Sequence, residues 1–208
     1  GEATKDFLAA RELVQSLRGR IFLDEKFSDI PTTVERTLRT LIVYGVRMIT
    51  VHANAGSESV FNVATFLKEH SSESRPLLLA VTVLSSFEEN ESELVFNRSL
   101  GAQVIEMARQ AKLAGADGII CSASELKFLR SYPELAPLIK VVSAIRPDHV
   151  YYRRDNHKRP MNPREAIKEG ADYLVIGRPI AEPVGISPEE SALRILHDVA
   201  SGIKQLHI

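Results

Sequence analysis

The chain has 208 residues, of which 44% are hydrophobic and 25% are charged, and its formal net charge is −1. This balance predicts one globular domain with a large core, and it lacks both the basic excess of a nucleic-acid-binding protein and an acidic tail. The apolar runs are too short to span a bilayer, and no basic-then-apolar signal pattern opens the chain. The single cysteine, Cys121, excludes an internal disulfide, which fits a reducing compartment. We therefore expect a cytoplasmic protein with neither a nucleic-acid nor a membrane partner.

Two kinds of segment alternate along the chain. Short runs rich in Val, Ile and Leu are almost continuously apolar, as strands buried on both faces must be. In chain order they predict strands at Arg20–Lys26, Arg47–Ala53, Leu77–Leu84, Gly118–Ala123, Ile139–Ile145 and Tyr173–Arg178. Apolar residues at helical spacing predict helices at Lys5–Arg18, Thr33–Tyr44, Glu58–Glu69, Leu100–Ala114, Pro163–Glu169 and Pro188–Leu206.

Several helix boundaries carry their own sequence signals. Gly45, Gly115 and Gly170 each stand just after a predicted helix, where a left-handed residue is needed. The segment 187–190 (Ser-Pro-Glu-Glu) predicts a capping box with proline in the first helical turn. Gly-Ala-Asp precedes a strand at both 115–117 and 170–172, which suggests one turn used twice.

The strict alternation of strand and helix predicts an α/β fold with a parallel sheet. An open doubly wound sheet and a closed (β/α)8 barrel both fit this pattern. The chain shows six predicted strands and begins with a helix, so a barrel requires that a first β-α-β segment be absent from it. Periodicity alone leaves this choice open.

The densest group of polar residues follows the first predicted strand. Asp24 and Lys26 are two residues apart, so in a regular strand they point to the same side. Pro31 disfavours helix at the residue before it, which places Asp29 and Thr33 at the carboxyl end of the strand, where α/β proteins hold their sites. The alternatives are a structural salt bridge at the barrel floor, or Asp29 and Thr33 serving only as helix caps.

A second group follows the last predicted strand. Gly177 allows close approach to an anion, and Arg178 offers a planar fork for phosphate. Arg146 directly follows the preceding strand and is a further candidate. Four basic residues of the next segment are instead expected to lie in a solvated loop: Arg153, Arg154, Lys158 and Arg159.

Other candidates are weak. The six histidines show no metal-ligand spacing. Ser86 and Cys121 lack the neighbouring base or nucleophile-elbow glycines of covalent catalysis. The acidic stretch Phe87–Glu93 predicts either a mobile lid or a solvated loop.

The segment 24–33 (Asp-Glu-Lys-Phe-Ser-Asp-Ile-Pro-Thr-Thr) resembles the signature of the orotidine 5′-monophosphate decarboxylase family, which phosphosugar lyases of the same superfamily share in part. Further matching motifs follow in the family's order and make the resemblance specific. They are Val51-His52-Ala53, Val81-Thr82-Val83-Leu84-Ser85-Ser86, Cys121-Ser122-Ala123, Ile145-Arg146-Pro147 and Ile176-Gly177-Arg178-Pro179-Ile180.

The resemblance implies a (β/α)8 barrel and a homodimer with sites at the subunit interface. Residues 1–208 would form a single decarboxylase barrel domain holding strands three to eight, with the first β-α-β segment absent. The implied reaction is decarboxylation of orotidine 5′-monophosphate to UMP, the last step of pyrimidine synthesis. It needs no metal, flavin or nicotinamide.

The resemblance also assigns residues. Lys26 would protonate C6 of the pyrimidine, Asp24 would lie near the substrate carboxylate, and Asp29 and Thr33 would reach in from the partner subunit. Ser85 would read the pyrimidine edge. The phosphate-binding residues would be Arg146, His157, Gly177 and Arg178.

The chain departs from the family pattern at several points. No counterpart is present for an aspartate of the family's first strand or a lysine of its second. His157 stands where the family has a phosphate-contacting glutamine, and Ala144 stands where it has glycine. Two alternatives remain open: a Mg²⁺-dependent phosphosugar lyase or aldolase of the same superfamily, and a non-catalytic relative that binds nucleotide without turnover.

Overall fold

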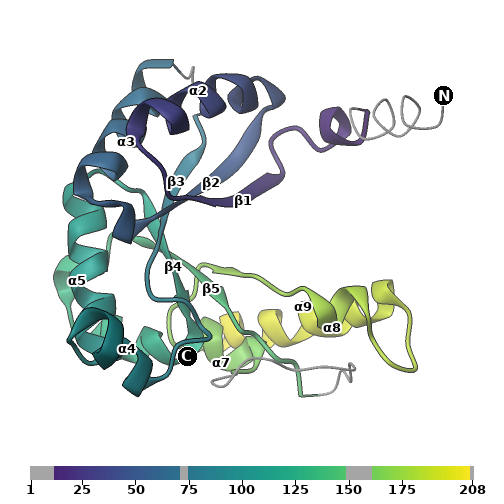
Figure 1. The fold of residues 1–208 in the computed structure, drawn as a ribbon. Helices are drawn as coiled ribbons and strands as arrows, with labels where there is room; N and C mark the ends of the chain where they lie inside the picture. Colours follow the sequence, from purple (N-terminus) through teal and green to yellow (C-terminus); the bar gives the residue numbers. More distant parts are fainter. Residues whose placement is uncertain (1–11, 71–74, 149–160, 207–208) are drawn as a thin grey trace. The chain divides into compact units, whose positions relative to one another are not determined.

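The computed structural model describes residues 12–70, 75–148 and 161–206 (Figure 1). It divides into two compact units. Unit 1 comprises Gly1–Val81 and Gln110–Asp117, and unit 2 comprises Thr82–Arg109 and Gly118–Ile208. Each unit contains parallel strands joined through helices. The predicted α/β class with parallel strands is confirmed, whereas the single domain over 1–208 stays a prediction.

Unit 1 is a parallel sheet in the order β1-β2-β3. Its elements are β1 (Ile21–Phe27), α2 (Pro31–Leu41), η1 (Ile42–Tyr44), β2 (Val46–His52), η2 (Ala53–Ala55), α3 (Ser57–His70) and β3 (Leu77–Val81). Residues 12–16 are helical as predicted, and the predicted helical residues before them lie outside the described part of the chain. Helix α3 packs against both α2 and β3.

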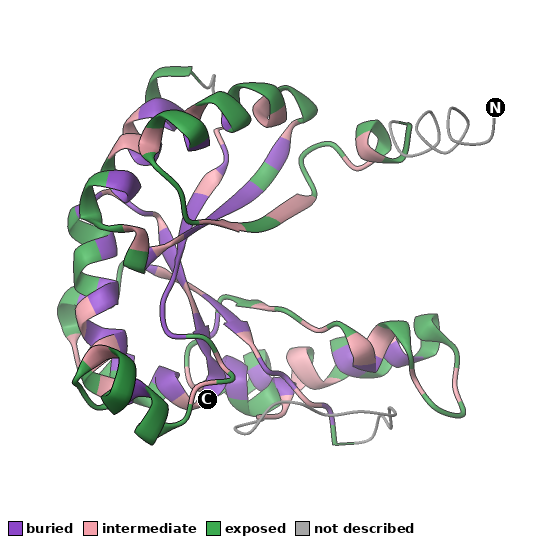
Figure 2. Cartoon of the chain, in the orientation of Figure 1, coloured by how far each residue is buried: buried purple, intermediate pink, exposed green. Residues whose placement is uncertain are grey.

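The core of unit 1 lies along β2 and β3, which Figure 2 shows as buried. Met48–Val51 and Leu78–Val81 are buried at consecutive positions, so both faces of these two strands are shielded from water. This explains why their sequences are almost continuously apolar. From α3, the fully buried Val63 and Leu67 add to the same core.

Unit 2 contains the parallel strands β4, β5 and β6 in that order. Its elements are α4 (Glu89–Phe96), the first part of α5 (Leu100–Leu113), β4 (Gly118–Ser122), η3 (Ala123–Glu125), α6 (Leu126–Arg130), η4 (Pro133–Leu135), β5 (Ile139–Ser143), α7 (Pro163–Lys168), β6 (Tyr173–Leu174), α8 (Arg178–Ala181) and α9 (Pro188–Lys204). None of the helices in the described ranges is long and apolar enough to cross a membrane.

Helix α4 corrects the loop alternative for the acidic stretch 87–93, because residues 89–93 are helical. The Glu88 carboxylate accepts from the backbone of the third helical residue, and the Glu91 carboxylate accepts the Glu88 N–H at 2.7 Å. This reciprocal cap satisfies backbone donors that would otherwise be unpaired at the helix start. The Glu-x-x-Glu spacing was the signal available in the sequence.

Three strands end earlier than predicted. The strands predicted to reach Leu84, Ile145 and Arg178 end at Val81, Ser143 and Leu174. After β5 the reason is local, because Ala144 has a φ of 62° and turns the chain out of the extended conformation. Apolar side chains continue past the ends of the strands because the segments that follow remain partly buried.

The two Gly-Ala-Asp segments form the same helix-to-strand turn, as predicted. In unit 1, Asp117 donates its N–H to Leu78 O at 2.9 Å, and its carboxylate accepts the Leu78 N–H at 2.8 Å. In unit 2, Asp172 exchanges the same two bonds with Lys140, at 2.9 and 2.8 Å. In both turns the glycine has a positive φ, 89° and 98° respectively. Each aspartate thereby fixes the start of the neighbouring strand.

Helices α7 and α9 pack closely because Gly202 lies between them. A Cβ at this position would come within 2.9 Å of Arg164 O and 3.1 Å of Ile167 Cβ. At the start of α9 the Ser187 hydroxyl accepts the Glu190 N–H at 3.1 Å, as the predicted capping box requires. The predicted capping box also requires the Glu190 carboxylate to accept the Ser187 N–H. In the described structure that carboxylate instead accepts from Arg194, at 2.5 Å.

The Asp117 turn offers a test of stability. Besides its backbone bonds, the Asp117 carboxylate accepts a bidentate pair of hydrogen bonds from the Arg75 guanidinium, at 2.6 and 2.7 Å. Asp117→Ala is expected to lower the free energy of unfolding by about 2–3 kcal/mol, because bonds to charged groups contribute about 1.5–3 kcal/mol. The matched variant Asp172→Ala loses no bond to an arginine, and it should lower the free energy of unfolding by only about 1 kcal/mol. Urea unfolding measures both, and equal losses would show that the arginine fork adds nothing.

Candidate active site

Asp24 and Lys26 form an ion pair at the carboxyl end of β1. Lys26 Nζ lies 2.5 Å from Asp24 Oδ2, and each side chain is 38% exposed. The sequence predicted that the two side chains point to the same side, and in the structure they are in contact. A ligand can reach both groups from solvent.

Their meeting does not come from regular strand alternation. Between the pairs Leu23↔Ile49 and Phe27↔Val51, β1 advances four residues while β2 advances two. Residues 24–26 therefore bulge out of the ladder, and Lys26 has a left-handed φ of 51°. Such a backbone conformation is uncommon for a residue with a side chain and is found preferentially at functional sites.

Thr50, which the sequence reading did not single out, lies opposite this bulge on β2. Its side chain is fully buried. The hydroxyl accepts the Lys26 N–H at 2.8 Å and donates to Asp24 Oδ1 at 3.0 Å. One polar residue inside an apolar strand run was the signal that could have pointed to it.

His52 lies two residues further along β2, on the same side of the strand as Thr50. Burial lowers the pKa of His52 below its ordinary 6.5, the Lys26 ammonium lowers it further, and Asp24 opposes both effects. Its Nδ1 is buried and has no hydrogen-bond partner within the described ranges. The ring is therefore neutral near pH 7 and adds no second positive charge beside Lys26.

Asp29 precedes α2, and Thr33 lies in its first turn. The helix begins at Pro31, with the extended Ile30 as N-cap and no side-chain cap bond. The alternative that these two residues are helix caps is therefore wrong: the Asp29 carboxylate accepts the Ile30 N–H at 2.7 Å, and Thr33 lies within the helix. In the described part of the chain, neither is bonded to Asp24 or Lys26.

Asp29 lines an open groove of about 370 Å³ on the surface of unit 1. Its lining residues are Ser28, Asp29, Ile30, Pro31, Ala55, Glu58 and Ser59. Ile30 is 64% exposed there. The groove thus combines carboxylates with an exposed apolar side chain.

The other predicted site residues belong to unit 2. Ser85 lies in a turn and is half-buried. Arg146 follows β5: its N–H donates to Met161 O at 2.8 Å, and its Nη1 donates to Ile145 O at 2.7 Å. The positive φ of Ala144, noted above, explains why glycine suits that position two residues before Arg146.

Gly177 and Arg178 follow β6, at the start of the four-residue helix α8. Because β5 and β6 pair in parallel, their carboxyl ends lie at one edge of the sheet. Arg146 comes after the end of β5 in the chain, and Gly177 and Arg178 come after the end of β6. The prediction that strand 173–178 extends to Arg178 is wrong, since β6 ends at Leu174. His157 lies outside the described residues.

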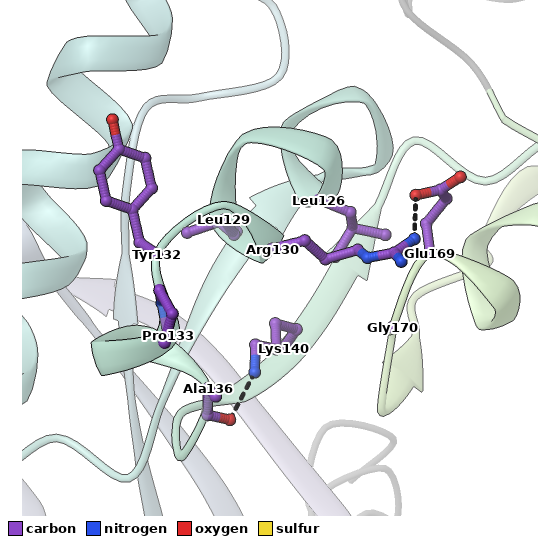
Figure 3. Close-up of a pocket in the computed structure, with 9 residues that line it drawn as sticks. All are labelled: Leu126, Leu129, Arg130, Tyr132, Pro133, Ala136, Lys140, Glu169 and Gly170. Carbon is purple, nitrogen blue, oxygen red and sulfur yellow. Dashed lines mark hydrogen bonds and ion pairs between the residues drawn. The ribbon is translucent and has the colours of Figure 1, made fainter.

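A second cavity, of about 160 Å³, lies near the amino ends of β5 and β6 (Figure 3). There Lys140 donates to Ala136 O at 2.8 Å, and Arg130 pairs with Glu169 at 3.1 Å. It includes none of the predicted site residues. In parallel α/β proteins this edge serves stability, and the carboxyl edge carries the chemistry.

Nucleophilic and metal chemistry find little support in the described residues. Burial raises the pKa of the Cys121 thiol well above its usual value, so the thiol stays protonated and unreactive. No group of three or more His, Cys, Asp or Glu side chains in the described ranges could hold a metal ion.

Comparison with known proteins gives one consistent result. The profile of the Orotidine 5'-phosphate decarboxylase / HUMPS family matches residues 4–195. A protein of Geotalea daltonii named orotidine 5'-phosphate decarboxylase is 38% identical over 196 residues, which are 93% of this chain and 80% of that protein. One of the same name from Legionella pneumophila is 40% identical over 182 residues, covering 86% and 76% of the two chains.

Solved structures agree with the sequence comparison. The crystal structure of orotidine 5'-phosphate decarboxylase from Lactobacillus acidophilus has a TM-score of 0.72 and 29% identity, and the match covers 91% of this chain and 80% of that one. An uncharacterized conserved protein from Geobacillus kaustophilus gives a TM-score of 0.68 at 30% identity, covering 86% and 75%.

The electrostatics of His52 can be tested by NMR titration of its ring. The midpoint should lie below 6.5, rise in Lys26→Ala, which removes a repelling cation, and fall in Asp24→Asn, which removes an attracting anion. A lowered folded-state pKa also means that this group destabilises the fold as pH falls through 6.5. Lys204→Ala, on the exposed end of α9, should leave the midpoint unchanged. A midpoint at or above 6.5 would contradict this account.

Proposed function

The chain belongs to the Orotidine 5'-phosphate decarboxylase / HUMPS family and is a decarboxylase, and we propose that it converts orotidine 5′-monophosphate to UMP. The observation that carries this proposal is the Lys26–Asp24 pair at the carboxyl end of β1. It places an ammonium and a carboxylate together, reachable from solvent, within the motif that resembles the family's signature.

The proposed reaction breaks the bond between C6 of the pyrimidine and its carboxyl group. CO₂ leaves and the electron pair stays on C6, where the ring cannot delocalise it well. The Lys26 ammonium stabilises this localised negative charge, and Nζ then donates a proton to C6. The neutral His52 supports this role, because it leaves Lys26 as the positive charge at this point of unit 1.

Asp24 has two proposed roles. Its carboxylate holds the Lys26 ammonium in place through the 2.5 Å contact. It also stands near the position proposed for the substrate carboxylate, where repulsion between like charges would be relieved as CO₂ leaves.

The proposed substrate contacts remote from C6 are the ones that the family resemblance implies. Ser85 reads the pyrimidine edge, and Arg146, His157, Gly177 and Arg178 bind the phosphate. Support comes from the placement of Arg146, Gly177 and Arg178 after neighbouring parallel strands, together with the suitability of arginine for phosphate. Binding energy from the phosphate can be expressed in the transition state for decarboxylation.

We also propose that the fold is a (β/α)8 barrel in which β1 to β6 are strands three to eight. The parallel order of the strands in each unit supports this assignment, as does the likeness to a decarboxylase of solved structure. The proposed assembly is a homodimer in which Asp29 and Thr33 complete the site of the partner. The open groove beside Asp29, with its exposed Ile30, supports an interface there.

Turnover in the presence of EDTA tests the reaction. The full-length protein should lower the ultraviolet absorbance of orotidine 5′-monophosphate in excess EDTA, and Lys26→Ala should lower kcat by about 100-fold or more, as for loss of a general acid. Lys204→Ala, an exposed lysine far along the sequence, should keep wild-type kcat.

The other outcomes separate the alternatives. Loss of turnover on chelation would favour a Mg²⁺-dependent phosphosugar lyase. Tight UMP binding without turnover would favour a non-catalytic relative, and His157 would be the first residue to restore to glutamine.

The shared site can be tested by mixing variants. Asp29→Ala and Lys26→Ala should each be inactive alone. After the two proteins are unfolded and refolded together, about a quarter of wild-type activity should return, because half of the dimers are mixed and each has one intact site. Each variant taken through the same procedure with itself is the control. If mixing restores nothing, Asp29 does not act across an interface.

A further inference from the structure

The buried hydroxyl of Thr50 connects the two charged residues of the proposed site. It is fully buried on β2. It joins Lys26, which is 24 positions away in the chain, to Asp24, which is 26 positions away. A hydroxyl has one proton to donate and can accept in return. Here the proton goes to Asp24 Oδ1, at 3.0 Å, and the oxygen accepts the Lys26 N–H, at 2.8 Å.

The three groups close a ring of interactions. Asp24 Oδ1 is held by Thr50, and Asp24 Oδ2 is held by the Lys26 ammonium. Thr50 in turn holds the main chain of Lys26. Both ends of the Lys26 residue, its backbone N–H and its Nζ, are thus fixed relative to one carboxylate.

The backbone of Lys26 needs such an anchor. Its φ of 51° lies in the left-handed region, which is unfavourable for a residue with a Cβ and persists only where surrounding contacts hold it. The bulge takes residues 24–26 out of the ladder, so the Lys26 N–H depends on a side chain for its partner. The hydroxyl of Thr50 supplies that partner.

We propose that Thr50 is a positioning residue for the decarboxylation, holding Asp24 and Lys26 in the geometry from which Lys26 acts on the substrate. This inference rests on the proposed function. Thr50 is buried beneath the pair and acts through it. A misplacement of about 1 Å in a group that acts on the reacting atoms costs about 100-fold in rate.

Kinetics of two matched substitutions test the role. Thr50→Val keeps the shape and removes the hydroxyl, whereas Thr50→Ser keeps the hydroxyl. Thr50→Val is expected to lower kcat about 10- to 100-fold, with KM changed less than about threefold, because the phosphate contacts are untouched. Thr50→Ser should recover kcat to within about threefold of wild type.

Thr82→Val is the control for losing a buried threonine hydroxyl. Thr82 is 1% exposed, and its hydroxyl donates to a backbone carbonyl, Ile120 O, at 2.8 Å. This variant should lose stability as Thr50→Val does while keeping kcat. If Thr50→Val does not fold, Thr50→Ala, which also lacks the hydroxyl, takes its place.

Amide hydrogen exchange at Lys26 provides a readout that does not depend on activity. Loss of the acceptor should speed exchange at the Lys26 N–H about tenfold or more in Thr50→Val, and Thr50→Ser should keep it protected. If the wild-type protein turns over no orotidine 5′-monophosphate, the proposed function fails, and protection at Lys26 still shows whether the anchor exists. Wild-type kcat in Thr50→Val, or equal losses in the Val and Ser variants, would overturn the inference.

Discussion

All strands of a parallel sheet enter at one edge and leave at the other, and within each unit this constraint decides where the polar groups lie. At the amino edges, Asp117 and Asp172 each clamp the neighbouring strand through two backbone bonds. At the carboxyl edges, Asp24 and Lys26 lie near the end of β1 in unit 1, and Arg146 and Arg178 follow β5 and β6 in unit 2. The same physical requirement thus separates residues that stabilise the sheet from residues available for chemistry.

Unit 1 combines a rigid anchor with an accessible charge. The main chain of Lys26 is bonded to the fully buried Thr50, while its side chain is 38% exposed. A bond in the water-poor interior is stronger than one at the surface, because water does not compete for its groups. The ammonium is therefore accessible to a ligand, while its main chain is held more rigidly than that of a lysine on a free loop. His52, kept neutral by burial and by Lys26 itself, adds no repulsion to this arrangement.

The family and the geometry answer different questions. Membership in the decarboxylase family rests on residues 4–195 and on relatives at 36–40% identity, and it identifies the chemistry to which the chain belongs. The contacts of Thr50, Lys26 and Asp24 show how this particular chain arranges charged groups that such chemistry can use. A fold shared by many enzymes could not have supplied that second answer.

The sequence by itself determined the α/β class, the order of strands and helices and the reuse of the Gly-Ala-Asp turn, because these depend on periodicity and short spacings. Tertiary structure decided the rest. Thr50 becomes part of the site only because the pairing of β1 with β2 brings it into contact with Lys26 and Asp24, which are distant from it in the sequence. The left-handed Lys26 is likewise a consequence of β1 advancing four residues while β2 advances two. The pairing of one strand with another fixes both features, and no local pattern along either strand encodes that register.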